Sequence, residues 1–241
     1  MTSKYFFSFI LLMSLNLYTH SQAINNAINF DGTDDYLSFD NLASPLSSSS
    51  NFTIEFWMKA DLNENTLTPR VNLFTINPAA PGENKFALLM GNEGDSQSGH
   101  FSVVETDDSN HYLTSQTIIG DNECHHISYV REGNVGEAFL DGESIGTLQV
   151  AQDLLPSDRI SLAQDWDNKT PTDFYNGSID GFRIWNVARS QFELRRDMNK
   201  RLTGSEMACF VITILIKELV METTTPWLQF KTLVQTKIMR H

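Results

Sequence analysis

From residue 27 onward, apolar and polar residues alternate in short runs that are separated by Gly, Asn, Asp and Pro. In NFTIEFWMKA, the apolar residues Phe52, Ile54, Phe56 and Met58 recur at every second position. A period of two is typical of a β-strand with one buried face. Similar runs are VNLFTI, KFALLM, HFSVVE, HHISYV, GEAFLDG, SIGTLQV and RISLAQ. The pattern predicts an all-β fold, a two-sheet antiparallel β-sandwich.

Two segments near the end of this pattern differ from a strand with one buried face. In GSIDGFRIW, strict alternation places Ile179 and Trp185 on one face and Phe182 on the other. Both faces then carry apolar side chains, which predicts a central strand. In ARSQFELRRDM, Ser190 and Glu193 have the spacing of a capping box, which predicts one short helix near the C-terminal end.

The N-terminus has the layout of a secretory signal peptide. Lys4 precedes an apolar run over residues 5–17, and small and polar residues follow. The run is shorter than the roughly 20 residues that an α-helix needs to cross a membrane. We therefore expect residues 1–21 to be a signal peptide, a secreted or cell-surface location, and no integral membrane segment after cleavage. Residues 22–206 are expected to form one domain.

The chain is acidic, with 17 Lys and Arg against 30 Asp and Glu and a net charge of -13. Such a surface repels phosphate backbones, which argues against a nucleic-acid partner, and it attracts cations. Cys124 and Cys209 are the two cysteines. Export would permit a disulfide between them, but a domain of this size does not need one.

Four stretches, INFDGTDDYLSF, NFTIEFWMKA, FLDGESIG and YNGSIDGFRIWNVARS, resemble the laminin G-like jelly rolls of the concanavalin A-like lectin and glucanase superfamily, in the form common on bacterial secreted proteins. The resemblance covers roughly residues 24–203 and implies a jelly roll. One position departs from the family pattern, because Cys124 stands where a Trp usually precedes the His.

The superfamily includes glycoside hydrolases, which need two carboxylates beside the scissile bond. The Glu-x-Asp-x-Glu strand pattern of the glucanase branch is absent from this sequence. We therefore expect a non-catalytic carbohydrate-binding or adhesion module whose partner is a carbohydrate or a cell-surface glycan. The alternatives are a glycoside hydrolase or an accessory module of one, and a structural spacer in a larger surface protein.

Aromatic residues beside amides and carboxylates are the candidate carbohydrate-binding groups. They are Trp166, Asp165, Asp167, Asn168, Tyr112 and Asn110. The alternative for Trp166 is a loop residue folded onto the sandwich. Trp57 and Trp185 lie inside predicted strands with apolar neighbours, and we expect them to be structural.

The resemblance also implies one structural calcium ion between the first strand and a late strand. Asp31 in FDG and Asp180 in SIDG are the corresponding positions. Carboxylates are the hard oxygen ligands that Ca²⁺ takes. Capping a turn or pairing with Arg183 is the alternative role for these residues.

Residues 207–241 do not continue the family pattern, which has a Gly-Leu and an aromatic-rich final strand after the helix. Codons for this tail, read from the third base of the Met207 codon, can encode GLFCYYNFNQG, which is close to that strand. The sequence therefore predicts a shift of reading frame near Glu206. The alternative is a genuine strand or helix from Cys209 to Met221.

Overall fold

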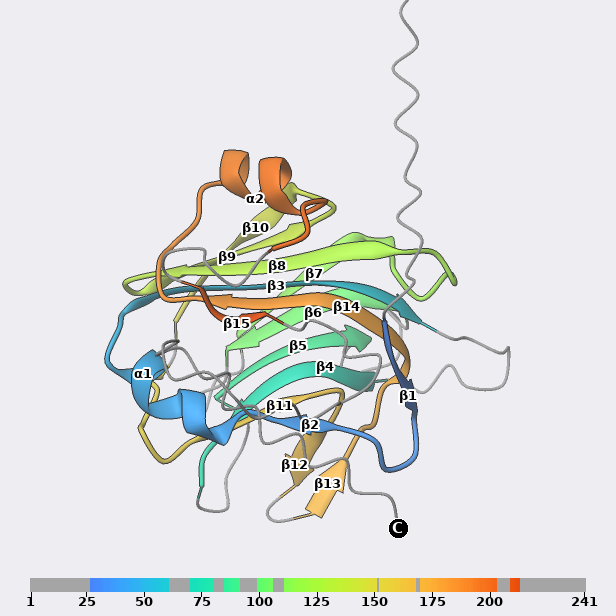
Figure 1. Ribbon diagram of the computed structural model, residues 1–241, viewed down its shortest axis with the longest axis horizontal. Coiled ribbons are helices and arrows are strands. Elements are labelled where there is room, and N and C mark those ends of the chain that lie inside the picture. The colour runs from blue at the N-terminus through green and yellow to red at the C-terminus, as the bar shows by residue number, and fades with distance from the viewer. Residues whose placement is uncertain are drawn as a thin grey trace, which may run out of the picture.

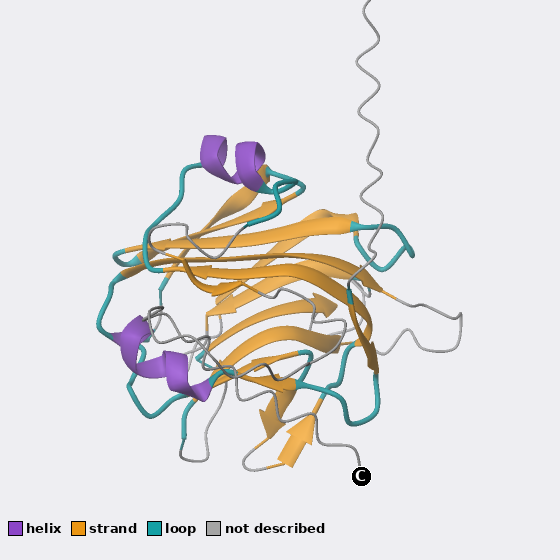
Figure 2. Cartoon of the chain, viewed as in Figure 1, coloured by secondary structure: helices purple, strands orange, loops and turns teal. Residues whose placement is uncertain are grey.

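The structure is a computed structural model, and it describes residues 27–60, 70–79, 85–91, 99–105, 111–150, 152–167, 170–202 and 209–212. Within this part of the chain, two antiparallel sheets lie face to face (Figures 1 and 2). The predicted all-β sandwich is therefore confirmed.

The seven-stranded sheet has the order β1-β14-β3-β8-β9-β10, with β15 also paired to β14. Its strands are β1 (Ile28–Asp31), β3 (Asn51–Ala60), β8 (His125–Glu132), β9 (Val135–Leu140), β10 (Glu143–Gln149), β14 (Asn176–Trp185) and β15 (Cys209–Ile212).

The six-stranded sheet has the order β2-β11-β4-β5-β6-β7. Its strands are β2 (Leu37–Ser38), β4 (Arg70–Asn77), β5 (Phe86–Gly91), β6 (His100–Glu105), β7 (His111–Ile118) and β11 (Arg159–Leu162). A small hairpin of β12 (Asp165–Asp167) and β13 (Thr170–Thr172) follows β11.

Aromatic side chains from both sheets fill the space between them. The ring of Phe182 on β14 lies 5.1 Å from Phe39, 6.1 Å from Phe56 and 5.8 Å from Phe74, between ring centroids. Each of these rings is at most 2% exposed. Because aromatic rings bury large apolar areas, this layer contributes much of the packing between the sheets.

Strict alternation fails in β14, and this corrects the faces that the sequence predicts. Gly181 has φ +59°, and the register with β3 shifts between Asp180 and Arg183. The shift returns Phe182 to the side of Ile179, so both are in the core, while Trp185 lies on the opposite face. A positive φ is readily adopted by Gly, which permits this bulge.

The predicted helix is present as α2 (Gln191–Asp197), with the capping box between Ser190 and Glu193. A 3-10 helix, η1 (Asp40–Leu42), and a second short helix, α1 (Ala43–Ser47), lie between β2 and β3 and are not among the elements that the sequence predicts. Among the described residues, no helix is long and apolar enough to cross a membrane.

Helix α2 packs on the outer face of the seven-stranded sheet (Figure 1), above a buried polar network. At its centre the Oε1 atom of Glu55, a residue with no exposed surface, accepts a hydrogen bond from Trp185 Nε1 at 2.7 Å and lies 3.5 Å from Arg183 Nη1. Burial raises the pKa of Glu55, but its hydrogen bond with His126 and the charge of Arg183 outweigh burial and hold the pKa below its ordinary value.

The two tryptophans on this face are structural, as the sequence predicts. Trp57 is 9% exposed and donates from Nε1 to the carbonyl oxygen of Met198 at 2.8 Å, and Trp185 is 5% exposed. Trp57 therefore ties the sheet to the end of α2, and Trp185 ties β14 to Glu55 of β3.

Part of the C-terminal tail contributes a strand. β15 pairs with residues 183–185 of β14, and β1 pairs with residues 176–179 of the same strand. Since β3 occupies the other side of β14, β1 and β15 share one edge. The fold thus has a place for one strand that follows α2, at this edge of β14. The remaining residues between 203 and 241 lie outside the described part.

Candidate functional site

The candidate site lies on the outer face of the six-stranded sheet, where β2 meets β11. Along β11, Ile160 and Leu162 belong to the core, so the alternate residues Arg159 and Ser161 belong to the outer face. Ser161 pairs with Ser38 of β2, which brings the neighbouring Tyr36 to the same place. The surface formed by Tyr36, Arg159 and Trp166 is called the Trp166 patch below.

The chain leaves β11 and turns back over it. Ala163 has φ +71°, and β12 then carries Trp166 onto the outer face of β11. Trp166 Nε1 donates to Ser161 Oγ at 2.8 Å, and the Arg159 guanidinium carbon lies 4.5 Å from the centre of the indole ring. The contact satisfies the indole N–H and adds a cation–π interaction.

Tyr36 completes the patch. Its ring meets the Trp166 ring edge to face, with 5.8 Å between centroids and an interplanar angle of 85°. Burial, followed by the negative charge of Asp40, raises the pKa of Tyr36, while the positive charge of Arg159 opposes this effect. Tyr36, Arg159 and Trp166 are all half-buried, so the patch is fixed in place and still partly accessible.

The two carboxylates beside Trp166 have different roles. Asp165 is 3% exposed, accepts a hydrogen bond from Asn77 Nδ2 at 2.9 Å and lies 3.7 Å from an Arg70 nitrogen. Asp165 therefore holds the hairpin on the sheet. Asp167 is exposed and accepts from Thr172 Oγ1 at 3.1 Å across the hairpin.

Tyr112 does not join the Trp166 patch. It pairs with Val104 in β7 and β6, and it packs against Ala87 and Leu89 on the outer face. Four strand-to-strand steps separate β7 from β11, or about 19 Å at the usual spacing. Trp166 and Tyr112 therefore do not contact one sugar ring together. Asn110 and Asn168 lie outside the described residues.

Tyr36 and Arg159 are site residues that the sequence reading does not identify. Alternation in DDYLSF does contain a signal for Tyr36, since Leu37 and Phe39 point to the core. Nothing local in the sequence signals that Arg159 meets Trp166.

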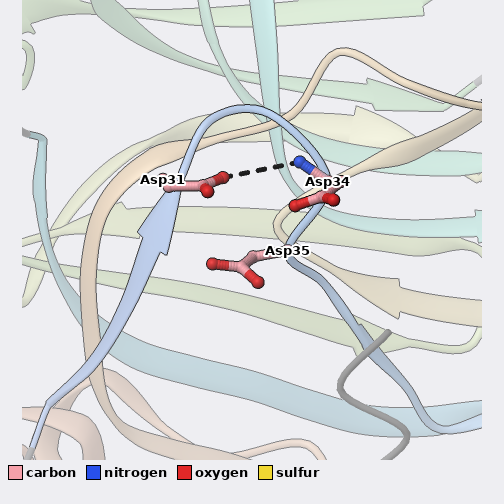
Figure 3. A group of neighbouring side chains, drawn as sticks. All are labelled: Asp31, Asp34 and Asp35. Atoms are coloured by element: carbon pink, nitrogen blue, oxygen red, sulfur yellow. Dashed lines mark hydrogen bonds between the residues drawn. The ribbon is translucent and has the colours of Figure 1, made fainter. Parts of the chain in front are cut away.

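Of the two predicted calcium ligands, Asp31 lies in a group of three aspartates. Asp31, Asp34 and Asp35 bring carboxylate oxygens within 4.8 Å of one another at the turn after β1 (Figure 3). One Asp31 oxygen accepts the backbone N–H of Thr33 at 2.8 Å and that of Asp34 at 3.4 Å. Asp31 thus caps its turn, and the three carboxylates provide the kind of donor that Ca²⁺ requires.

Asp180 is not part of this group. Asp31 pairs with Asn176, so Asp180 lies four residues farther along β14, or about 13 Å away. One oxygen of Asp180 accepts the N–H of Gly181 at 2.7 Å. The antiparallel register of β1 and β14 therefore prevents Asp31 and Asp180 from sharing an ion.

Residues 31–195 match the Laminin_G_3 family model, described as Concanavalin A-like lectin/glucanases superfamily. The chain belongs to this family. The match runs from the end of β1 into α2, so it includes every strand from β2 to β14 but not β15, and it confirms the resemblance that the four sequence stretches indicate. No curated protein matches the sequence of this laminin G-like chain.

Solved structures with the same fold are distant in sequence. The carbohydrate-binding module CBM40 of the Ruminococcus gnavus IT-sialidase, bound to alpha2,3 sialyllactose, has 16% identity and a TM-score of 0.56, covering 71% of this chain and 95% of the module. The heptameric SAP-like pentraxin of Limulus polyphemus has 16% identity and a TM-score of 0.53, covering 70% and 79%.

A putative carbohydrate binding protein of Bacteroides ovatus ATCC 8483 has 16% identity and a TM-score of 0.56, covering 77% of this chain. The laminin G-like chain spans 50% of that protein. At these identities, the similarities establish the fold alone.

Proposed function

We propose that this laminin G-like domain is a secreted, non-catalytic module that binds carbohydrate at the Trp166 patch. The observation that carries the proposal is the fixed, half-buried Trp166, whose indole N–H bonds Ser161 and whose ring contacts Tyr36 and Arg159. Sites for small ligands combine apolar or aromatic surface with a few placed polar groups. The patch combines the aromatic surface of Tyr36 and Trp166 with the guanidinium of Arg159.

Two further observations support the proposal. The R. gnavus module is bound to a sialylated sugar, and the B. ovatus protein is described as carbohydrate binding. The N-terminal pattern of a signal peptide supports an extracellular location, where glycans on cells or polymers are available. We assign the ligand-contacting residues from the contacts within this chain, because 16% identity to these proteins is too low to transfer their binding residues.

A glycan array tests the proposal. The wild-type chain is compared with Trp166→Ala and with Phe192→Ala, which removes an aromatic ring that is 70% exposed on α2, outside the patch. We expect wild type and Phe192→Ala to bind the same glycans, and Trp166→Ala to lose at least about tenfold in affinity, because truncating an aromatic residue at the centre of a binding site costs about 2 kcal/mol or more.

Two outcomes contradict the proposal. One is an array without any bound glycan, and the other is unchanged binding by folded Trp166→Ala. A reducing-sugar assay on the bound glycans tests the non-catalytic part, since release of reducing ends would favour a glycoside hydrolase.

A further inference from the structure

We infer that the Trp166 patch selects sugars that carry a carboxylate, and that Arg159 is the residue that recognises it. This inference rests on the proposed function and adds to it a class of ligand and a specificity-determining residue. It comes from the contacts of Arg159, which differ from those of nearly every other described arginine.

The described arginines are almost all neutralised by carboxylates. Ion pairs within 4.0 Å join acidic side chains to Arg70, Arg131, Arg183, Arg189, Arg195 and Arg196. Within the described residues, the two arginines without an ion pair are Arg159 and Arg201, and Arg201 is exposed beyond α2. Arg159 is therefore the one half-buried arginine of this part of the chain that lacks a carboxylate partner.

The local structure holds the guanidinium of Arg159 in a defined position. Its backbone is fixed by pairing with Asn77 of β4, and its guanidinium lies over the Trp166 ring at 4.5 Å. Stacking on an aromatic ring leaves the N–H groups at the edge of the guanidinium available. No hydrogen bond joins these N–H groups to another described residue.

The nearby carboxylates are engaged elsewhere. Asp40 acts on Tyr36 electrostatically, but its Oδ1 atom accepts the backbone N–H of Ile160 at 3.0 Å, and no ion pair joins it to Arg159. Asp167 accepts from Thr172 across the hairpin. The guanidinium is thus an ordered, unpaired cation in a patch of aromatic side chains.

Such a cation suits a carboxylate of the ligand. The planar guanidinium forms two parallel N–H···O bonds with a carboxylate, and these charge-assisted bonds are stronger than bonds to neutral hydroxyls. The net charge of -13 repels anions at long range, so the selectivity must arise from this close contact. A sugar ring against Trp166 and Tyr36 would place its acid group beside Arg159.

The experiment compares each acidic sugar with its own methyl ester, which has the same ring but no charge. The probes are 3′-sialyllactose and tri-galacturonic acid, measured by calorimetry against wild type, Arg159→Gln, Arg159→Lys and Arg201→Gln. We expect at least one free acid to bind wild type about tenfold more tightly than its ester. Arg159→Gln should remove this preference and Arg159→Lys should reduce it.

Arg201→Gln is the matched control, because it removes the same charge from the other unpaired arginine, and it should keep the preference. Equal binding of acid and ester, or a preference that survives in Arg159→Gln, overturns the inference and leaves the proposed function intact. If neither probe binds and the array finds neutral glycans, the inference also fails. If neither probe binds and the array finds nothing, the proposed function fails with it.

Discussion

Trp185→Ala is expected to remove a large part of the stability of the domain. Trp185 lies at the end of β14 with 5% of its surface exposed, and its Nε1 atom donates to Glu55 Oε1 at 2.7 Å. The Arg189 guanidinium lies 3.9 Å from the centre of the indole ring. The substitution therefore creates a cavity beside Glu55 and Arg189, and it removes a hydrogen-bond donor from a carboxylate that has no exposed surface.

Both losses have known magnitudes. Truncating a buried Trp to Ala costs about 3–5 kcal/mol. Removing a hydrogen bond to a buried charged group costs about 1.5–3 kcal/mol, part of which is already contained in the first figure. We therefore expect a loss of about 4–6 kcal/mol, against a total free energy of unfolding of about 5–15 kcal/mol for a typical domain.

Urea unfolding followed by circular dichroism measures this loss. Trp185→Phe keeps most of the apolar volume but not the N–H, so it should lose only about 1.5–3 kcal/mol. Trp166→Ala, at a half-buried position, should lose less than either. A Trp185→Ala protein whose free energy of unfolding lies within about 1 kcal/mol of wild type would refute the structural role of the network around Glu55.

Three further predictions concern the turn after β1, His125 and the tail. Calcium in excess over chelator should raise the melting temperature of wild type, and less so in Asp34→Asn, because an ion that binds only the folded state stabilises it; identical wild-type curves contradict a calcium site. The hydrogen bond to Asp141, together with the Asp121 charge, raises the pKa of His125. Its stabilisation is complete below the unfolded pKa of about 6.5 and is lost as pH rises through the folded value. Melting temperatures of wild type should therefore fall over that range relative to His125→Asn, and parallel pH profiles would disprove this. Residues 22–206 followed by GLFCYYNFNQG should be more soluble and unfold more cooperatively than residues 22–241, because the uncharged apolar run CFVITILI of the tail favours association; equal solubility and cooperativity would rule out the frameshift.

The parts of the fold that local chemistry determines could be predicted from the sequence. Period-two patterns identify the strands because alternate residues of a strand face the core between the sheets. The spacing of Ser190 and Glu193 identifies α2 because the two side chains cap the same helix end. The bulge at Gly181 could not be predicted, since alternation alone does not reveal where a register shifts.

The candidate site depends on contacts between distant parts of the chain, and the sequence predicts these poorly. Trp166 is recognisable as an aromatic residue among polar neighbours, but its partner Tyr36 reaches it only because β2 pairs with β11. The same limit applies to the calcium site predicted from Asp31 and Asp180. Their family positions imply a shared ion, whereas the register of β1 with β14 separates them.

Hydrogen exchange with and without the tightest-binding glycan from the array tests the central claim most directly, because it reports where on the chain the ligand binds. If the Trp166 patch is the binding site, peptides that cover Tyr36 to Ser38 and Arg159 to Thr172 should exchange more slowly in the complex. Peptides that cover α2 should not change. Protection confined to α2 or to β7, with none around Trp166, would contradict the account.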